Sequence, residues 1–258
     1  MKTDPFQLHG KVAIVTGSTR GIGFGIAAQL CSAGASCIIS SENPQDVGDA
    51  TRTLKNKSYD VMGVTCDVQN PDAQKSLVDK TLKTYGRLDI LVCNAGITGN
   101  AGPIEDNDNH DYRRVFDINL HSMVTLCNAV HPTMKKQGTG SIILVSSISA
   151  LRGNSTINGY ALAKAGVTQL ARNLAVQWGP LGIRANAISP GFIRTELSEP
   201  LLKSQTFMDR RIQMTPLRRP GEVGEIAAGV QFLASDAASF VTGHDLVIDG
   251  GTTVTDGS

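Results

Sequence analysis

Lys11-Val-Ala-Ile-Val-Thr16-Gly17-Ser-Thr-Arg-Gly21-Ile-Gly23 runs from an apolar, β-branched segment into three closely spaced glycines. The apolar segment is typical of a buried strand, and Phe24–Leu30, which follows, has helical periodicity. Strand, glycine turn and helix in this order are typical of dinucleotide binding: Gly17 allows the tight turn, Gly21 admits the pyrophosphate, and Gly23 lets helix and strand pack closely. Free N–H groups at the helix start then face phosphate oxygens. A glycine-rich turn without a ligand is the structural alternative.

The same alternation of strand and helix continues along the chain. Strands are expected at Val12–Thr16, Ser36–Ser40, Val61–Thr65, Ile90–Val92, Ser141–Val145, Arg184–Ile188 and Leu246–Ile248. Helices are expected at Phe24–Ala33, Asp46–Asn56, Pro71–Tyr85, His110–Lys136, Gly159–Trp178 and Gly221–Ala234. Strands separated by helices imply right-handed crossovers. The sequence therefore predicts an α/β, Rossmann-like, doubly wound parallel sheet of seven strands with helices on both faces, which binds ligands at the carboxyl ends of its strands.

Length and composition favour one domain over residues 1–258, since no linker, repeat or low-complexity segment divides the chain. The net charge is +1 with both signs interspersed, which argues against a nucleic-acid surface and a polybasic membrane anchor. No apolar run approaches the roughly 20 residues of a membrane span, and the first residues lack the apolar core of a secretion signal. We therefore expect a cytoplasmic protein without nucleic-acid or membrane partners.

Cysteine and histidine give no sign of a metal centre. The five cysteines are scattered and form no Cys-x-x-Cys pair, so we interpret them as small buried hydrophobes rather than a redox site. The five histidines show no ligand spacing, and we predict no catalytic metal. His110 or His121 could contact a substrate, with a surface or core histidine as the alternative.

Tyr160 and Lys164 are four residues apart in an expected helix, and Ser147 lies thirteen residues before Tyr160. Residues at i and i+4 share one helix face. A free phenol has a pKa of about 10, and a nearby cation favours its charged form, so this pair could form a tuned proton exchanger. By itself the pair could equally be helix surface.

Several motifs together resemble one family. Thr16-Gly-Ser-Thr-Arg-Gly-Ile-Gly23, Asn94-Ala-Gly96, Asn119, Ser147, Tyr160-Ala-Leu-Ala-Lys164 and Pro190-Gly191 stand in the order and at the spacings of the short-chain dehydrogenase/reductase family. The resemblance runs from about Gly10 to Gly251, and the glycine pattern and length resemble the compact, single-domain branch. It implies an enzyme that exchanges a hydride between a nicotinamide dinucleotide and a carbonyl or hydroxyl group.

The resemblance also implies catalytic roles. Tyr160 would be the acid in reduction and the base in oxidation, and Ser147 would hold the substrate oxygen; Ser146 is the rival hydroxyl, but the spacing to Tyr160 selects Ser147. Lys164 would lower the Tyr160 pKa and bind the nicotinamide ribose. Asn119 resembles the residue that holds a relay water, with a helix-bending polar residue bonded to its own backbone as the structural alternative.

Contacts to the cofactor are implied for eighteen residues, which lie in the glycine turn, after later strands and in the Tyr160 segment. They are Gly17, Thr19, Arg20, Gly21, Ile22, Gly23, Ser41, Asp67, Val68, Asn94, Ala95, Gly96, Tyr160, Lys164, Pro190, Gly191, Ile193 and Thr195. The structural alternative for Asp67 is to cap the turn after its strand.

The choice between NADP and NAD depends on a few side chains. Members that prefer NAD resemble one another in carrying an aspartate where Ser41 stands, and Arg20 could pair with a 2′-phosphate. Both features favour NADP. Glu42 argues the other way, because its carboxylate would repel that phosphate or bind the 2′-hydroxyl of NAD. We therefore expect NADP, with NAD as the alternative.

Residues from about 192 to 219 resemble the family's variable substrate lid, and with Ile97–Gly102 and Ile148–Arg152 they should wall the substrate pocket. We expect a ketone, diketone or secondary alcohol of modest size, and hence a carbonyl reductase or alcohol dehydrogenase. Arg194 could steer an acidic substrate, with a solvated surface arginine as the alternative.

Two other functions stay open. The first is a 3-oxoacyl-[acyl-carrier-protein] reductase, although the arginines that such enzymes present to the carrier are absent at the aligned Gly138 and Leu181. The second is a non-catalytic dinucleotide-binding regulator. Since the family is commonly tetrameric, we also expect a homo-oligomer, with a C-terminal contact through Leu246-Val-Ile-Asp-Gly-Gly251.

Overall fold

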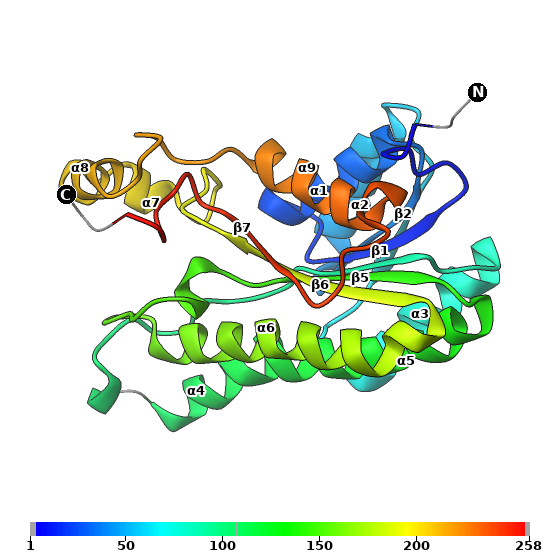
Figure 1. Cartoon of the computed structure of the whole chain (residues 1–258), viewed down its shortest axis with the longest axis horizontal. Coiled ribbons are helices and arrows are strands. Elements are labelled where there is room, and N and C mark those ends of the chain that lie inside the picture. Colours follow the sequence, from blue (N-terminus) through cyan, green and yellow to red (C-terminus); the bar gives the residue numbers. More distant parts are fainter. Residues whose placement is uncertain (1–3, 107, 256–258) are drawn as a thin grey trace.

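The computed structural model describes residues 4–106 and 108–255 and contains the predicted sheet (Figure 1). Its seven strands are β1 (Val12–Thr16), β2 (Ser36–Ser41), β3 (Val61–Thr65), β4 (Ile90–Cys93), β5 (Gly140–Val145), β6 (Ile183–Pro190) and β7 (Asp245–Ile248). They follow the spatial order β3-β2-β1-β4-β5-β6-β7, and every pair is parallel. The predicted Rossmann-like, doubly wound α/β fold is confirmed.

Helices cover both faces of this sheet. Figure 1 shows α1 (Gly21–Ser32), α2 (Pro44–Lys55) and α9 (Val223–Ala234) on one face. The other face carries α3 (Pro71–Tyr85), α5 (Ser122–Gln137) and α6 (Asn158–Trp178), with α4 (Asn109–Phe116) beside α6. Short 3₁₀ turns lie at Ile104–Asp106, Ile148–Ala150, Gly179–Leu181 and Asp236–Ala238. No helix in the described part of the chain combines the length and apolar character needed to cross a membrane.

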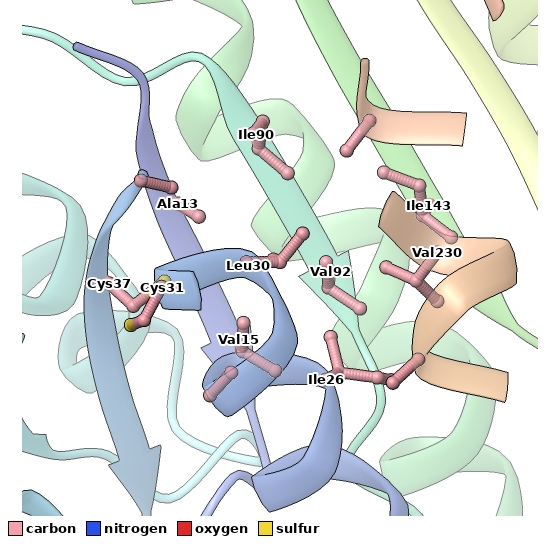
Figure 2. Close-up of a cluster of buried hydrophobic side chains, with 14 of the residues drawn as sticks. Ala13, Val15, Ile26, Leu30, Cys31, Cys37, Ile90, Val92, Ile143 and Val230 are labelled. Atoms are coloured by element: carbon pink, nitrogen blue, oxygen red, sulfur yellow. The ribbon is translucent and has the colours of Figure 1, made fainter. Parts of the chain in front are cut away.

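Two hydrophobic cores hold these layers together. Because side chains alternate across a strand, Ala13 and Val15 of β1 face the α1–α9 side, whereas Val12 and Ile14 face the α3–α5–α6 side. Figure 2 shows the first core, in which α1 packs between β1 and α9. Burial on both faces explains why the strands read as continuous apolar runs.

The five cysteines are all buried and carry free thiols. Cys31 and Cys37 lie side by side in the first core (Figure 2), and Cys93 and Cys127 belong to the second. Their interpretation as small buried hydrophobes is confirmed.

The predicted continuous helix His110–Lys136 is wrong in its middle. A π-helical turn over Asp117–His121 separates α4 from α5, so the segment contains one wide turn where regular α-helix was expected. The prediction also ended β6 too early: the strand continues to Pro190, which pairs with Ile248. Pro190 is the last residue of β6, and the Gly191 N–H that follows it still donates to the Ile248 carbonyl.

The segment 192–219 contains two short helices, α7 (Glu199–Leu202) and α8 (Gln205–Gln213), which lie beyond the carboxyl edge of the sheet (Figure 1). The chain after β7 contacts this segment, because the Leu217 N–H donates to the Gly250 carbonyl over 3.1 Å. The C-terminal turn therefore supports the segment expected to cover a substrate.

Candidate active site

Four of the predicted motifs follow adjacent strands of the sheet. Gly17 follows β1, Asn94 follows β4, Ser146 and Ser147 follow β5, and Pro190 ends β6. These strands are neighbours in the order β1-β4-β5-β6 and are parallel. The motifs therefore line one edge, where the carboxyl ends of the strands meet.

The glycine turn has the backbone that only glycine adopts readily. Gly17 and Gly21 have φ angles of 60° and 54°, in the left-handed region. A Cβ on Gly23 would lie 2.1 Å from the Gly17 carbonyl oxygen and 2.4 Å from Asn94 Nδ2. Asn94 Nδ2 donates to the carbonyls of Thr16 and Gly17, each over 3.0 Å. The turn is thus packed directly against the end of β4.

The start of α1 fits a phosphate group. Asn43 and Asn70 accept backbone N–H groups at the starts of α2 and α3, but no side chain caps α1, whose N-cap is Arg20. Its first turn contains no acidic residue. A Cβ on Gly21 would meet nothing closer than Thr195 at 3.8 Å, so space is open beside the turn. Uncapped N–H groups next to open space are the arrangement that binds phosphate oxygens.

Thr16 is a positioning residue that was not recognised from the sequence. Its Oγ1 accepts the N–H groups of Asn94 and Ala95, over 3.0 and 3.2 Å. This contact joins the ends of β1 and β4. Nothing in a β-branched residue at the end of a strand distinguishes such a role from ordinary packing.

Asn119 is fully buried in the π-helical turn and bonds the loop after β4. Its Oδ1 accepts the Ile97 N–H over 2.8 Å, and its Nδ2 donates to the Ile97 carbonyl over 2.7 Å. The helix is irregular here, but the side chain bonds Ile97 and not its own helix backbone. A Cβ on Gly96 would be 2.9 Å from Asn119 Oδ1 and 3.5 Å from Lys164 Nζ, which brings these two side chains to the same glycine.

Ser146 and Ser147 have different surroundings. The Ser146 hydroxyl donates to the Lys164 carbonyl over 2.9 Å, which ties β5 to α6. The Ser147 Oγ accepts the Ser149 N–H over 3.1 Å, which leaves its own O–H as a donor. This difference agrees with the choice of Ser147 over Ser146.

Tyr160 and Lys164 share one face of α6, with Lys164 Nζ 5.6 Å from the centre of the Tyr160 ring. Lys164 Nζ donates to the Val145 carbonyl over 2.7 Å. Burial raises the pKa of Tyr160, and a hydrogen bond with Ser147 opposes this rise. Burial also lowers the pKa of Lys164 to about 8. In the protein alone, burial therefore outweighs the Ser147 hydrogen bond and raises the Tyr160 pKa, whereas the sequence predicts that Lys164 lowers it.

The buried ammonium makes stability depend on pH. Below pH 8 the folded protein holds a buried charge; between about 8 and 10.5 the unfolded chain binds the extra proton, so stability rises with pH. The pKa difference corresponds to about 3 kcal/mol. Between pH 7.5 and 10.5, we expect urea unfolding to show wild type gaining about this much free energy relative to Lys164→Met. The exposed Lys203→Met should run parallel to wild type, and parallel curves for Lys164→Met would contradict the assignment.

Arg20, Ser41 and Glu42 form the corner that was expected to select the cofactor. The Ser41 hydroxyl donates to Glu42 Oε2 over 2.8 Å. The backbone N–H of Glu42, the Ser41 hydroxyl and the Arg20 guanidinium together lower the pKa of Glu42. The Glu42 carboxylate therefore interacts electrostatically with the Arg20 guanidinium. The residue that favours NADP and the residue that favours NAD lie near each other.

Asp67 is exposed and occupies the capping position. Its Oδ1 accepts the Gln69 N–H over 2.9 Å, as the structural alternative required. The neighbouring Val68 carbonyl accepts Gln74 Nε2 over 2.6 Å. Capping the turn uses Oδ1 and leaves Asp67 Oδ2 without a bond to the turn. The capping role is therefore compatible with the expected contact to the cofactor.

The residues after β6 are held by backbone contacts. The Gly191 N–H donates to the Ile248 carbonyl over 2.9 Å, and a Cβ on Gly191 would lie 2.7 Å from Asp249 Cα. Ile193 is buried and bridges to Gly221, and the Thr195 N–H donates to Ser198 Oγ over 2.9 Å.

The sequence indicates Arg194, His110 and His121 as possible substrate contacts, and all three are exposed. Arg194 is exposed and forms an ion pair with Glu222 over 3.2 Å, which fits a solvated surface arginine. His110 and His121 are exposed, and His121 Nδ1 lies 2.8 Å from Asp117 Oδ1. Among residues 4–106 and 108–255, no three His, Cys, Asp or Glu side chains gather as a metal site would require.

The chain is similar to known proteins over nearly its whole length. Residues 17–253 match the model of a family described as enoyl-(acyl carrier protein) reductase. The chain is 36% identical over 247 residues to the short-chain dehydrogenase/reductase SDRA of Arabidopsis thaliana, and the match covers 96% of each protein. It is similar to a gluconate 5-dehydrogenase from Burkholderia cenocepacia in complex with NADP and tartrate, with a TM-score of 0.94, 33% identity and 98% of each chain covered. It is also similar to a 7α-hydroxysteroid dehydrogenase complexed with NADH and 7-oxo glycochenodeoxycholic acid, with a TM-score of 0.93, 34% identity and 97% of each chain covered.

Proposed function

Since the chain belongs to the short-chain dehydrogenase/reductase family of NAD(P)-dependent oxidoreductases, we propose that it interconverts a ketone and a secondary alcohol with Tyr160 as general acid and base. One observation carries the proposal: Ser147, Tyr160 and Lys164 lie together at the strand edge that also holds the glycine turn. Ser147 bonds Tyr160, and Lys164 Nζ lies 5.6 Å from the centre of the Tyr160 ring. A hydroxyl donor, a half-buried phenol and a buried ammonium are the groups that carbonyl reduction requires.

The bound nicotinamide supplies or accepts the hydride, and the protein handles the proton. Because burial raises the pKa of Tyr160, its phenol is protonated at neutral pH and can give its proton to the substrate oxygen in reduction. The Ser147 hydroxyl donates to the same oxygen and holds it beside the phenol. Lys164, fixed by the Val145 carbonyl, places positive charge near the phenolate that results. Asn119 keeps the loop at Ile97 and Gly96 beside Lys164.

Oxidation runs these steps in reverse and needs the phenolate. A single ammonium within about 4–6 Å typically lowers a pKa by 1–3 units, and here burial works against it. Positive charge on the oxidised nicotinamide would add to that of Lys164 in favouring the phenolate.

The direct test is a screen of nicotinamide absorbance with both cofactors against ketones, diketones and secondary alcohols. Turnover of any carbonyl supports the proposal. Tight dinucleotide binding without turnover across the panel would favour the non-catalytic regulator instead.

Cofactor contacts are proposed for the residues that surround the strand edge. The glycine turn and the uncapped start of α1 would bind the pyrophosphate, and Lys164 the nicotinamide ribose. Pro190, Gly191, Ile193 and Thr195 would meet the nicotinamide. Similar structures carry NADP in one case and NADH in another, so a nicotinamide dinucleotide is common to both.

We propose NADP as the preferred form, because Arg20 is the cation at the exposed corner beside Ser41. Arg20→Ala should lower kcat/KM for NADP about 10-fold and change that for NAD little. Glu42→Gln, which removes the opposing carboxylate, should shift the ratio toward NADP. Steady-state kinetics with both cofactors measure this, with the exposed Arg52→Ala as control. Equal losses with both cofactors would assign Arg20 to the shape of the turn.

A second candidate is a reductase of carrier-bound 3-oxoacyl groups; the matching family model is described by the reduction of carrier-bound enoyl groups, which supports this candidate only loosely. Gly138 and Leu181 stand where such enzymes are expected to present arginines, although Lys135 and Lys136 are exposed at the adjacent end of α5. Turnover of acyl-carrier substrates well above that of free ketones would support it.

We also propose that residues 1–258 act as one domain, with the 192–219 segment as substrate lid, and that copies assemble as a tetramer. Exposed apolar side chains support assembly: Leu162 and Val176 on α6, and Phe240 before β7. Light scattering gives the mass in solution.

A further inference from the structure

Arg211 is held in a fixed place on α8 by two aromatic rings. The carbon of its guanidinium lies 5.5 Å from the centre of the Phe192 ring and 5.3 Å from that of Phe207. The two rings are themselves 5.2 Å apart in an edge arrangement. Cation–π contacts with two rings restrict the guanidinium and use none of its N–H groups.

Arg211 has no counter-charge within the described residues. Some arginines of the chain pair with acids, among them Arg194 with Glu222, Arg219 with Glu225, and Arg87 with Asp89. Over residues 4–106 and 108–255, the Arg211 guanidinium has neither an ion pair nor a hydrogen bond. The Arg152 guanidinium also has neither within these residues. Burial, then Arg152, then Arg210 lower the pKa of Arg211, so the charges of Arg152 and Arg211 act on each other. Both side chains are half-buried.

The two arginines lie on segments that leave the strands nearest to Ser147. Arg152 follows Ser147 by five residues, after the 3₁₀ turn Ile148–Ala150. Phe192, under Arg211, comes two residues after the end of β6. Strands β5 and β6 are neighbours, and the Ser146 N–H donates to the Ile188 carbonyl over 2.8 Å. The pair therefore flanks the part of the edge where the substrate oxygen is proposed to bind.

We propose that Arg211 and Arg152 bind an anionic group of the substrate, a carboxylate, so that the enzyme acts on oxo acids and the corresponding hydroxy acids. This inference rests on the proposed function of the same site. Two half-buried like charges without a counterion repel each other, and a carboxylate between them removes this repulsion. A planar guanidinium also matches a carboxylate through two parallel hydrogen bonds.

The cofactor phosphates are the other source of an anion. Their proposed site is the glycine turn and Arg20 at the end of β1, whereas Arg152 and Arg211 flank the ends of β5 and β6. In the strand order, β4 separates β1 from β5. We therefore assign the arginine pair to the substrate.

Equilibrium binding tests the assignment independently of turnover. Pyruvate, acetoacetate and levulinate, each against its methyl ester, are titrated calorimetrically into the protein with bound cofactor. We expect at least one acid to bind 10-fold or more tightly than its ester. Arg211→Met and Arg152→Met should weaken that acid about 10- to 100-fold and leave the ester unchanged. Arg210→Met, which removes a charge from the exposed side of the same helix, is the matched control; it should weaken acid binding far less than Arg211→Met and leave ester binding unchanged.

Other outcomes would overturn the assignment. The assignment is wrong if the methyl esters bind as tightly as every acid. It is also wrong if Arg211→Met weakens the binding of acid and ester equally. Weaker cofactor affinity in both arginine variants would assign the pair to the cofactor, and stronger binding of glyceraldehyde phosphate would exclude the carboxylate class. Arg211→Lys keeps a positive charge beside the two rings and should retain part of the preference for the acid. It thereby controls for a loss of binding that comes from misfolding of the segment. Absence of turnover with retained acid preference would count against the proposed reaction only.

Discussion

Tyr160→Phe is expected to lower turnover of any ketone substrate by about 10²- to 10⁴-fold, the range that a general acid contributes. The change removes one hydroxyl and keeps the ring, so the packing on α6 and the position of Lys164 Nζ 5.6 Å from the ring centre should persist. Dinucleotide affinity should therefore stay within a factor of a few. Steady-state kinetics and fluorescence titration of the reduced cofactor measure the two quantities.

Tyr85→Phe is the matched control for Tyr160→Phe. It also removes a phenolic hydroxyl, one that donates to Asp60 over 3.1 Å on the distant end of α3, and it should leave turnover unchanged. If Tyr160→Phe retained most of the wild-type rate, proton transfer would have to come from another group, and the role proposed for Ser147 would need revision as well.

Gly23→Ala should abolish tight dinucleotide binding and destabilise the protein by about 2 kcal/mol or more. The new Cβ would lie 2.1 Å from the Gly17 carbonyl oxygen, an atom of the turn itself, so the turn or the start of α1 must move. Either movement displaces the N–H groups proposed to bind the pyrophosphate. Urea unfolding gives the stability, and calorimetric titration with the dinucleotide gives the affinity.

Gly48→Ala is the control for Gly23→Ala and should raise, not lower, the free energy of unfolding. Gly48 lies within α2, and a Cβ there would meet nothing within 4 Å. Alanine should therefore stabilise the helix by about 0.5–1 kcal/mol and leave the affinity unchanged. Tight dinucleotide binding by Gly23→Ala would show that the close approach of helix and strand is not needed.

Most of the fold could be predicted from periodicity. The bounds of β1, β3 and α3 are as predicted, because each has a clear apolar pattern and a turn residue or proline at its border. The starts of α1 and α9 were displaced by two or three residues. In α1 the helix begins inside the glycine turn at Gly21, and in α9 Glu222 and Glu225 form the capping pair, a role that is more often filled by serine or threonine. The π-helical turn has no residue signature at all.

The candidate site divides in the same way. Tyr160 and Lys164 could be named in advance because their spacing places them on one helix face, and Ser147 because its distance from Tyr160 along the chain resembles the family's pattern. The arginine pair could not, since Arg211 lies in a segment without a clear pattern, and only the packing of Phe192 on Phe207 shows where its side chain is held. The raised pKa of Tyr160 also depends on burial, which sequence spacing does not reveal.

The extra residue in the turn Asp117–His121 sets the angular phase of the two helices that it joins. An α-helix advances about 100° per residue. If the same residues instead closed into a regular α-helical turn, α4 would rotate by about that angle against α5. Tyr112 of α4, whose ring would be 3.1 Å from a Cβ on Gly159, would then swing away from the segment that carries Tyr160. The wide turn therefore sets the rotation of α4 relative to α5, so that α5 packs on the sheet while α4 contacts the start of α6.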